Sequence, residues 1–144
     1  MIHRIFPPSA NNDYSGHKIA YLFFVFIAII SMGRSLIHVF LPDGGAGVIA
    51  GLDLSLGSEN IIFAFGLWGV SQGVYALIQL LVAFRYKSLI PLMYIILIIE
   101  TLGRMMIGMI KPPLLFHTPP GAFANWILLP VAVIMLYASL KEKA

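Results

Sequence analysis

The sequence predicts an all-α membrane protein, an up-down bundle of four transmembrane helices with both termini on the cytoplasmic side. Composition supports this class first: 60% of the 144 residues are hydrophobic and only 10% are charged, against about 25% in an ordinary soluble domain. The mean hydropathy is +0.93. A soluble chain of this length has too little interior to bury so much apolar surface, so the bilayer must be its main solvent.

Four apolar runs, each long enough to cross a hydrocarbon core of about 30 Å, support the same class. We expect one domain, residues 1–144, with spans at residues 17–41, 61–84, 89–110 and 122–140. Glycine- and proline-rich segments separate the runs and predict turns. The outer loop, residues 42–60, contains an apolar stretch at 48–56 that is too short to span. This stretch can form a short interfacial helix or a re-entrant piece, and the sequence leaves both open.

The distribution of lysine and arginine predicts the orientation. One side of the bundle collects six of them, namely Arg4, Lys18, Arg85, Lys87, Lys141 and Lys143. The other side has only Lys111. Positive residues stay in the cytoplasm, so both termini should be cytoplasmic.

Several kinds of chemistry are excluded or unsupported. The chain has no cysteine, which rules out disulfides, thiolate metal sites and cysteine nucleophiles. It contains no phosphate-binding loop, no dinucleotide fingerprint and no nucleophile elbow. No local histidine and carboxylate spacing predicts a metal. We therefore expect no cofactor and no metal, and no nucleic-acid partner, because the positive charges lie where topology explains them.

Three charged residues lie inside the predicted spans and away from the cytoplasmic ends, and they are the first place to look for a site. Unpaired, Arg34, Glu100 and Arg104 would together cost on the order of 8–10 kcal/mol. Glu100 precedes Arg104 by four residues, a favourable order for an ion pair on a helix. One carboxylate can neutralise only one arginine, so the other must find Glu59, Asp53 or the carboxylate or phosphate of a ligand.

Polar residues of three spans are expected at similar depths, in the outer half of the bilayer. Arg34 and His38 lie on one face of the first span because they are four residues apart. Gln72 lies near the middle of the second span, on a face that includes the Gly69–Gly73 pair. That GxxxG pair predicts close helix packing within the chain or between copies. The candidate ligand-binding site therefore comprises Arg34, His38, Gln72, Glu100 and Arg104, and a purely structural network is the competing interpretation.

Four segments carry a resemblance to a known group of proteins. They are Ser-Leu-Ile-His-Val-Phe-Leu-Pro-Asp-Gly-Gly-Ala at 35–46, Leu-Trp-Gly at 67–69, Arg-Tyr-Lys-Ser-Leu-Ile-Pro-Leu-Met-Tyr at 85–94 and Glu-Thr-Leu-Gly-Arg at 100–104. In these segments the chain resembles small bacterial four-span membrane proteins. The resemblance covers most of the chain and implies the fold and a location in a bacterial inner membrane, but it carries no assigned activity.

For function, the charged spans favour a non-enzymatic membrane module that binds a lipophilic anionic ligand or a partner protein through the outer-half polar site. Two alternatives stay open. One is a membrane enzyme acting on a lipid or isoprenoid, with Glu100 or His38 as acid or base. The other is a small oligomeric transporter in which Glu100 carries a proton. The expected partners are the lipid bilayer, a lipophilic anionic small molecule, and a second copy of the chain or a membrane partner subunit.

Overall fold

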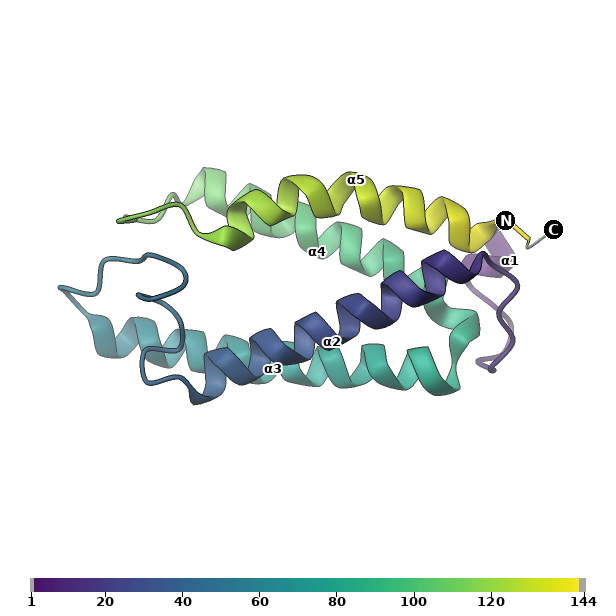
Figure 1. Ribbon diagram of the computed structural model, residues 1–144, viewed down its shortest axis with the longest axis horizontal. Helices are drawn as coiled ribbons and strands as arrows, with labels where there is room; N and C mark the ends of the chain where they lie inside the picture. Colours follow the sequence, from purple (N-terminus) through teal and green to yellow (C-terminus); the bar gives the residue numbers. More distant parts are fainter. Residues whose placement is uncertain (1, 143–144) are drawn as a thin grey trace.

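The computed structural model describes residues 2–142, and over that range it is helical apart from turns, irregular segments and one isolated bridge (Figure 1). In chain order the elements are α1 (Ile2–Ile5), α2 (Lys18–Phe40), α3 (Ser58–Arg85), the 3-10 turn η1 (Lys87–Leu89), α4 (Ile90–Ile110) and α5 (Pro120–Leu140). This confirms the predicted all-α class. The four long helices begin and end within three residues of the expected spans.

The four long helices are suited to a bilayer by length and by surface. They contain 23, 28, 21 and 21 residues, and at about 1.5 Å per residue each covers a hydrocarbon core. Only 11–33% of their most apolar windows is buried inside the protein. Phe26, Ile99 and Ile134 lie mid-helix and are each more than half exposed. The chain is therefore a multi-pass membrane protein that turns most of its apolar surface outward.

The helices run up and down as two hairpins. α2 packs along α3, and α4 packs along α5 (Figure 1). The two hairpins meet mainly where α2 approaches α5. α1 and the end of α5 lie at the same end of the molecule (Figure 1), as an even number of crossings requires.

The hydrophobic core joins the hairpins toward the end that carries α1. Its central contact pairs Phe24 of α2 with Tyr94 of α4, whose rings meet edge to face with centroids 5.8 Å apart. The Tyr94 hydroxyl donates a hydrogen bond of 2.5 Å to the carbonyl of Ala20. Because that carbonyl belongs to α2, one side chain satisfies its own polar group and connects two hairpins.

The GxxxG pair of α3 packs against α2 of the same chain. A Cβ atom added at Gly69 would lie 2.7 Å from the Cβ of His38, and one at Gly73 would lie 2.5 Å from Ser35 Oγ. Ser35 Oγ also donates a hydrogen bond of 2.8 Å to the Gly69 carbonyl. The missing side chains therefore let the two backbones approach, which is the packing use of this motif.

The long loop between α2 and α3 contains no helix. Residues 42–50 and 55–57 form turns, so the apolar stretch 48–56 does not form the interfacial helix that the sequence allowed. The physical reason is the four glycines at 44, 45, 51 and 57, whose φ angles of +60° to +73° interrupt any right-handed helix. The loop instead pairs with the α4–α5 connection, where Phe116 N donates to Gly51 O at 2.7 Å.

Candidate functional site

A small polar cavity lies between the two hairpins, and all four long helices contribute to its wall. Its volume is about 50 Å³. Its lining residues are Ile27, Ile30, Ser31, Arg34, Gln72, Tyr75, Leu97, Glu100, Arg104 and Leu128. The structure thus brings together four of the five residues predicted from the sequence. The fifth, His38, lies outside this lining.

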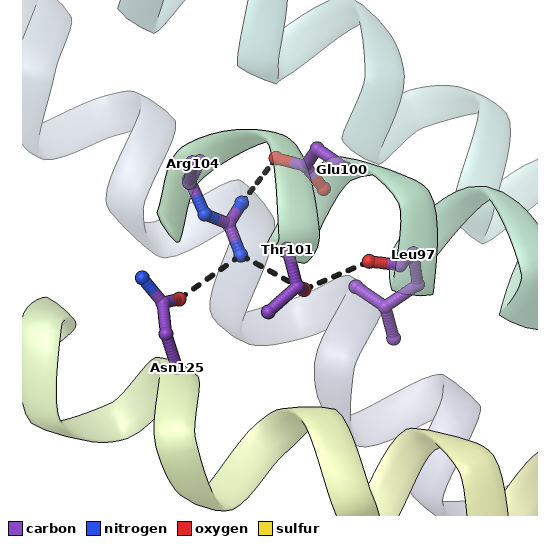
Figure 2. Close-up of polar contacts among 5 residues, drawn as sticks. All are labelled: Leu97, Glu100, Thr101, Arg104 and Asn125. Atoms are coloured by element: carbon purple, nitrogen blue, oxygen red, sulfur yellow. Dashed lines mark hydrogen bonds and ion pairs between the residues drawn. The ribbon is translucent and has the colours of Figure 1, made fainter. Parts of the chain in front are cut away.

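Glu100 and Arg104 form an ion pair one turn apart on α4, as their spacing predicts (Figure 2). The other terminal nitrogen of Arg104 donates to Thr101 Oγ1 at 3.2 Å and to Asn125 Oδ1 at 3.3 Å. Thr101 Oγ1 in turn donates to the Leu97 carbonyl at 2.8 Å. The Arg104 guanidinium is therefore neutralised within α4 and also bonded to α5.

Sequence reasoning did not include Thr101 and Asn125 in the site. Thr101 stands three residues before Arg104 and four after Leu97, so its hydroxyl can serve both partners on one helix face. Asn125 is the single amide side chain of α5. An isolated amide in an apolar span needs a hydrogen-bond partner, so the sequence could have indicated Asn125 as a site residue on this ground. The spacing of Thr101 could have indicated that residue.

Arg34 is the arginine that Glu100 does not neutralise. Within residues 2–142, no carboxylate oxygen lies within 4 Å of its guanidinium nitrogens. Its Cζ atom instead lies 5.7 Å from the centre of the Trp68 ring, which is within the range of a cation–π contact. Asp53, one of the loop acids considered for it, accepts a hydrogen bond from the backbone of Ser55. Arg34 therefore brings an excess positive charge to the cavity wall.

His38 is a buried side chain with a different surrounding. Its Nδ1 lies 2.7 Å from the carbonyl oxygen of Gly44, and since a carbonyl only accepts, the proton must be on Nδ1. The ring stacks on Trp68 at 4.7 Å and meets Phe65 edge to face. This bond to the backbone ties the end of α2 to the start of the loop.

Two polar atoms of the cavity-lining residues have no hydrogen-bond partner among residues 2–142. They are Gln72 Oε1 and the Tyr75 hydroxyl, both buried. A buried polar atom without a partner costs about 1–3 kcal/mol, so water or a ligand atom would be favoured beside them. A cavity of about 50 Å³ has room for a few water molecules. Within the same residues, no three histidine, aspartate or glutamate side chains cluster as a metal site.

Four apolar helices around a charged cavity define the class: a multi-pass α-helical membrane protein. Comparisons with protein-family models, with curated proteins and with solved structures returned no match for this chain. The formal charges of Arg34, Arg104 and Glu100 at the wall of the cavity sum to +1.

Proposed function

We propose that this protein is a non-enzymatic binding module of a bacterial inner membrane, with both termini in the cytoplasm. It holds the anionic head of a lipophilic molecule beside Arg34. The observation that carries the proposal is the charge of Arg34, which lines a cavity inside the membrane span and has no carboxylate partner among the described residues. Charges inside a span are costly, and they most often serve a ligand, an ion or a partner.

The size of the cavity restricts what enters it. Pockets that enclose a whole drug-sized molecule have volumes of about 300–1,000 Å³, whereas this cavity measures about 50 Å³. Only a small polar head fits, and a carboxylate matches the flat, two-pronged guanidinium of Arg34. The apolar part of the ligand would remain outside, against the exposed aliphatic surface of the helices.

The polar atoms around Arg34 suit such a head group. Arg104 is already neutralised by Glu100, so it contributes fixed geometry more than free charge. Water bound beside Gln72 Oε1 and the Tyr75 hydroxyl can complete the hydrogen bonding of a carboxylate. The apolar lining, which includes Ile27, Ile30 and Leu97, keeps the local dielectric low and strengthens the attraction to Arg34.

Binding of oleate, a carboxylate with one acyl chain, tests the proposal. The protein is purified in a mild non-ionic detergent, and bound oleate is measured by native mass spectrometry. We expect Arg34→Gln to weaken binding about 10-fold to 100-fold, the equivalent of one charge-assisted hydrogen bond of about 1.5–3 kcal/mol. Arg34→Lys should recover only part of the affinity, because lysine keeps the charge and loses the two-pronged geometry.

Arg85→Gln is the matched control, since it removes the same charge from an exposed arginine at the far end of α3. It should leave oleate binding unchanged. Equal affinity in Arg34→Gln and the control would contradict the proposal and favour a structural network. Proton-coupled flux in liposomes that Glu100→Gln abolishes would instead identify a transporter.

A further inference from the structure

A second and larger cavity lies at the end of the molecule that carries α1. Its volume is about 270 Å³, close to the lower limit for small-molecule pockets. It is lined by Asn12, Tyr14, Gly16, Lys18, Tyr21 and Lys87. These residues come from the segment before α2, from the first turn of α2 and from η1. The cavity therefore lies where the spans end, at the depth of the lipid head groups.

The wall of this cavity is held by hydrogen bonds to two other parts of the chain. Asn11 and Ser88 exchange three of them: Asn11 N to Ser88 Oγ at 3.0 Å, Ser88 Oγ to Asn11 O at 3.1 Å and Ser88 N to Asn11 O at 3.2 Å. His17 N donates to the carbonyl of Ala138 in α5 at 3.1 Å. The segment before α2 is thus attached both to the α3–α4 connection and to α5.

Gly16 shows how tightly this segment is seated. It is buried, and a Cβ atom at this position would lie 2.4 Å from the Ser139 carbonyl oxygen. Tyr14 beside it donates from its hydroxyl to the His17 carbonyl at 3.2 Å. Burial raises the pKa of Tyr14 to about 12, so the phenol stays neutral at physiological pH. The cavity is therefore a defined part of the fold.

The charge of the lining is positive. Lys18 and Lys87 supply two ammonium groups, and no lining residue is acidic. Lys87 Nζ lies 5.1 Å from the centre of the Tyr21 ring, so this aromatic residue restrains the ammonium at the cavity. Asp13 follows Asn12 in the chain, is exposed and is not part of the lining. Two ammonium groups, a neutral phenol and an amide form a lining that attracts a phosphate group.

We propose that this cavity binds a phosphate group between Lys18 and Lys87, independently of the site at Arg34. The two sources of that group are the head of an anionic phospholipid and soluble phosphate. The position at the ends of the spans places the two lysines at the level of lipid phosphates, where each lysine attracts an anionic lipid.

The experiment compares two double variants in the full-length protein. Lys18→Gln with Lys87→Gln removes both cavity lysines. Arg85→Gln with Lys141→Gln removes the same charge from exposed residues at the same end that do not line the cavity. Binding of phosphatidylglycerol and of phosphatidylcholine is measured by native mass spectrometry in detergent. Melting temperatures of all three proteins establish that each is folded.

We expect one phosphatidylglycerol per wild-type chain, bound in preference to phosphatidylcholine. Its affinity should fall about fivefold for each cavity lysine removed and about 25-fold for both, the equivalent of about 1 kcal/mol for each lysine. The Arg85 and Lys141 control should lose much less. Equal losses in the two double variants, or undiminished binding without the cavity lysines, would overturn the proposal.

A second titration, with inorganic phosphate at constant ionic strength, identifies the source. Displacement of phosphatidylglycerol by inorganic phosphate, with the same dependence on Lys18 and Lys87, assigns the site to soluble phosphate. Retention of the lipid against phosphate assigns it to a phospholipid head. If neither probe binds the wild-type protein, the proposal is wrong. Arg34→Gln should change neither result, which separates this site from the one between the hairpins.

Discussion

The three ionisable side chains Arg34, Glu100 and Arg104 line one cavity, and the two arginines have different neighbours. Arg104 is bonded to Glu100, Thr101 and Asn125, whereas Arg34 lies over Trp68. The difference has consequences that substitutions can measure. Removing one member of the Glu100–Arg104 pair leaves the charge of the other uncompensated inside the membrane. Removing both leaves no uncompensated charge from this pair.

A double-mutant cycle tests the pair. Glu100→Gln and Arg104→Leu should each destabilise the protein, and the double variant should recover part of the loss. We expect a coupling energy on the order of 1–3 kcal/mol, measured by unfolding in mixed micelles. Glu59→Gln with Arg85→Leu is the control, because these residues stand at opposite ends of α3 and should behave additively. Additive effects at Glu100 and Arg104 would show that the pair contributes nothing specific.

Asp43 organises the loop after α2 through its carboxylate. That carboxylate accepts backbone hydrogen bonds from Gly45 at 2.8 Å, Gly47 at 3.0 Å and Val48 at 2.8 Å. The bonds, with that of Val48 contributing most, hold the pKa of Asp43 below its ordinary value. The folded protein thus binds a proton at Asp43 less readily than the unfolded chain. The free energy of unfolding therefore rises as the pH rises from the lowered pKa of folded Asp43 to the ordinary aspartate pKa.

Asp43→Asn should therefore destabilise the protein by about 1 kcal/mol at pH 7, because an amide cannot accept all three bonds. The difference from wild type should persist above the ordinary aspartate pKa, near 3.9. It should vanish as the pH falls through the lower pKa of folded Asp43. Thermal unfolding between pH 7 and pH 2.5 measures this. Asp13→Asn, at an exposed position, should show no comparable change.

At the scale of elements, α2 and α3 pack closely along their length. Gly69 and Gly73 lie against His38 and Ser35, with no room for a further carbon atom. The two contacts differ in kind: the atoms around Gly69 include the backbone of α2, whereas Gly73 meets the movable hydroxyl of Ser35. The helices must separate to admit a side chain at Gly69, and Ser35 can rotate to admit one at Gly73.

Gly69→Ala should accordingly destabilise the protein by about 1–3 kcal/mol, the usual range for overpacking. Gly73→Ala should cost less. Gly66→Ala and Gly103→Ala are matched controls, because nothing lies within 4 Å of a Cβ atom at either position. Both should be neutral or slightly stabilising, since alanine favours helix over glycine. Unfolding in mixed micelles compares the four, and equal effects at Gly66 and Gly69 would contradict the packing account.

At the scale of the whole molecule, two hairpins joined by a short connection must place both loops on one side of the bilayer. The loops do lie together, because Asp53 N donates to Leu114 O and Phe116 N to Gly51 O across them. The segment before α2, the α3–α4 connection and the end of α5 gather at the opposite end. The absence of native cysteine makes this arrangement measurable by introduced thiols.

Single cysteines at four exposed positions test the topology in intact bacterial cells with a membrane-impermeant maleimide. Ser55→Cys and Thr118→Cys should react in intact cells. Ser9→Cys and Lys141→Cys should react only after the membrane is opened. The fully reversed pattern would contradict the cytoplasmic termini while preserving the fold. Reaction of both Ser9→Cys and Ser55→Cys in intact cells would contradict the hairpin arrangement itself.

The sequence by itself determined the class of the fold, the number of long helices and the position of Glu100 beside Arg104 on one helix face. Hydropathy is a property of each segment, and a separation of four residues brings two side chains together on any helix. The spans and the proximity of Glu100 and Arg104 can therefore be predicted before the packing of the helices is known. Four of the five predicted site residues converge on one cavity for the same reason, since depth follows from position along each span.

Only the tertiary structure decided which arginine Glu100 neutralises, where His38 turns and how Asn125 joins the network. These outcomes depend on the rotation of each helix about its own axis, which the packing of Gly69 and Gly73 against α2 helps to set. The conformation of the α2–α3 loop could not be predicted either, because the segment with which it pairs lies about sixty residues further along the chain. Contacts between distant segments form only when the whole chain packs, so no local pattern specifies them.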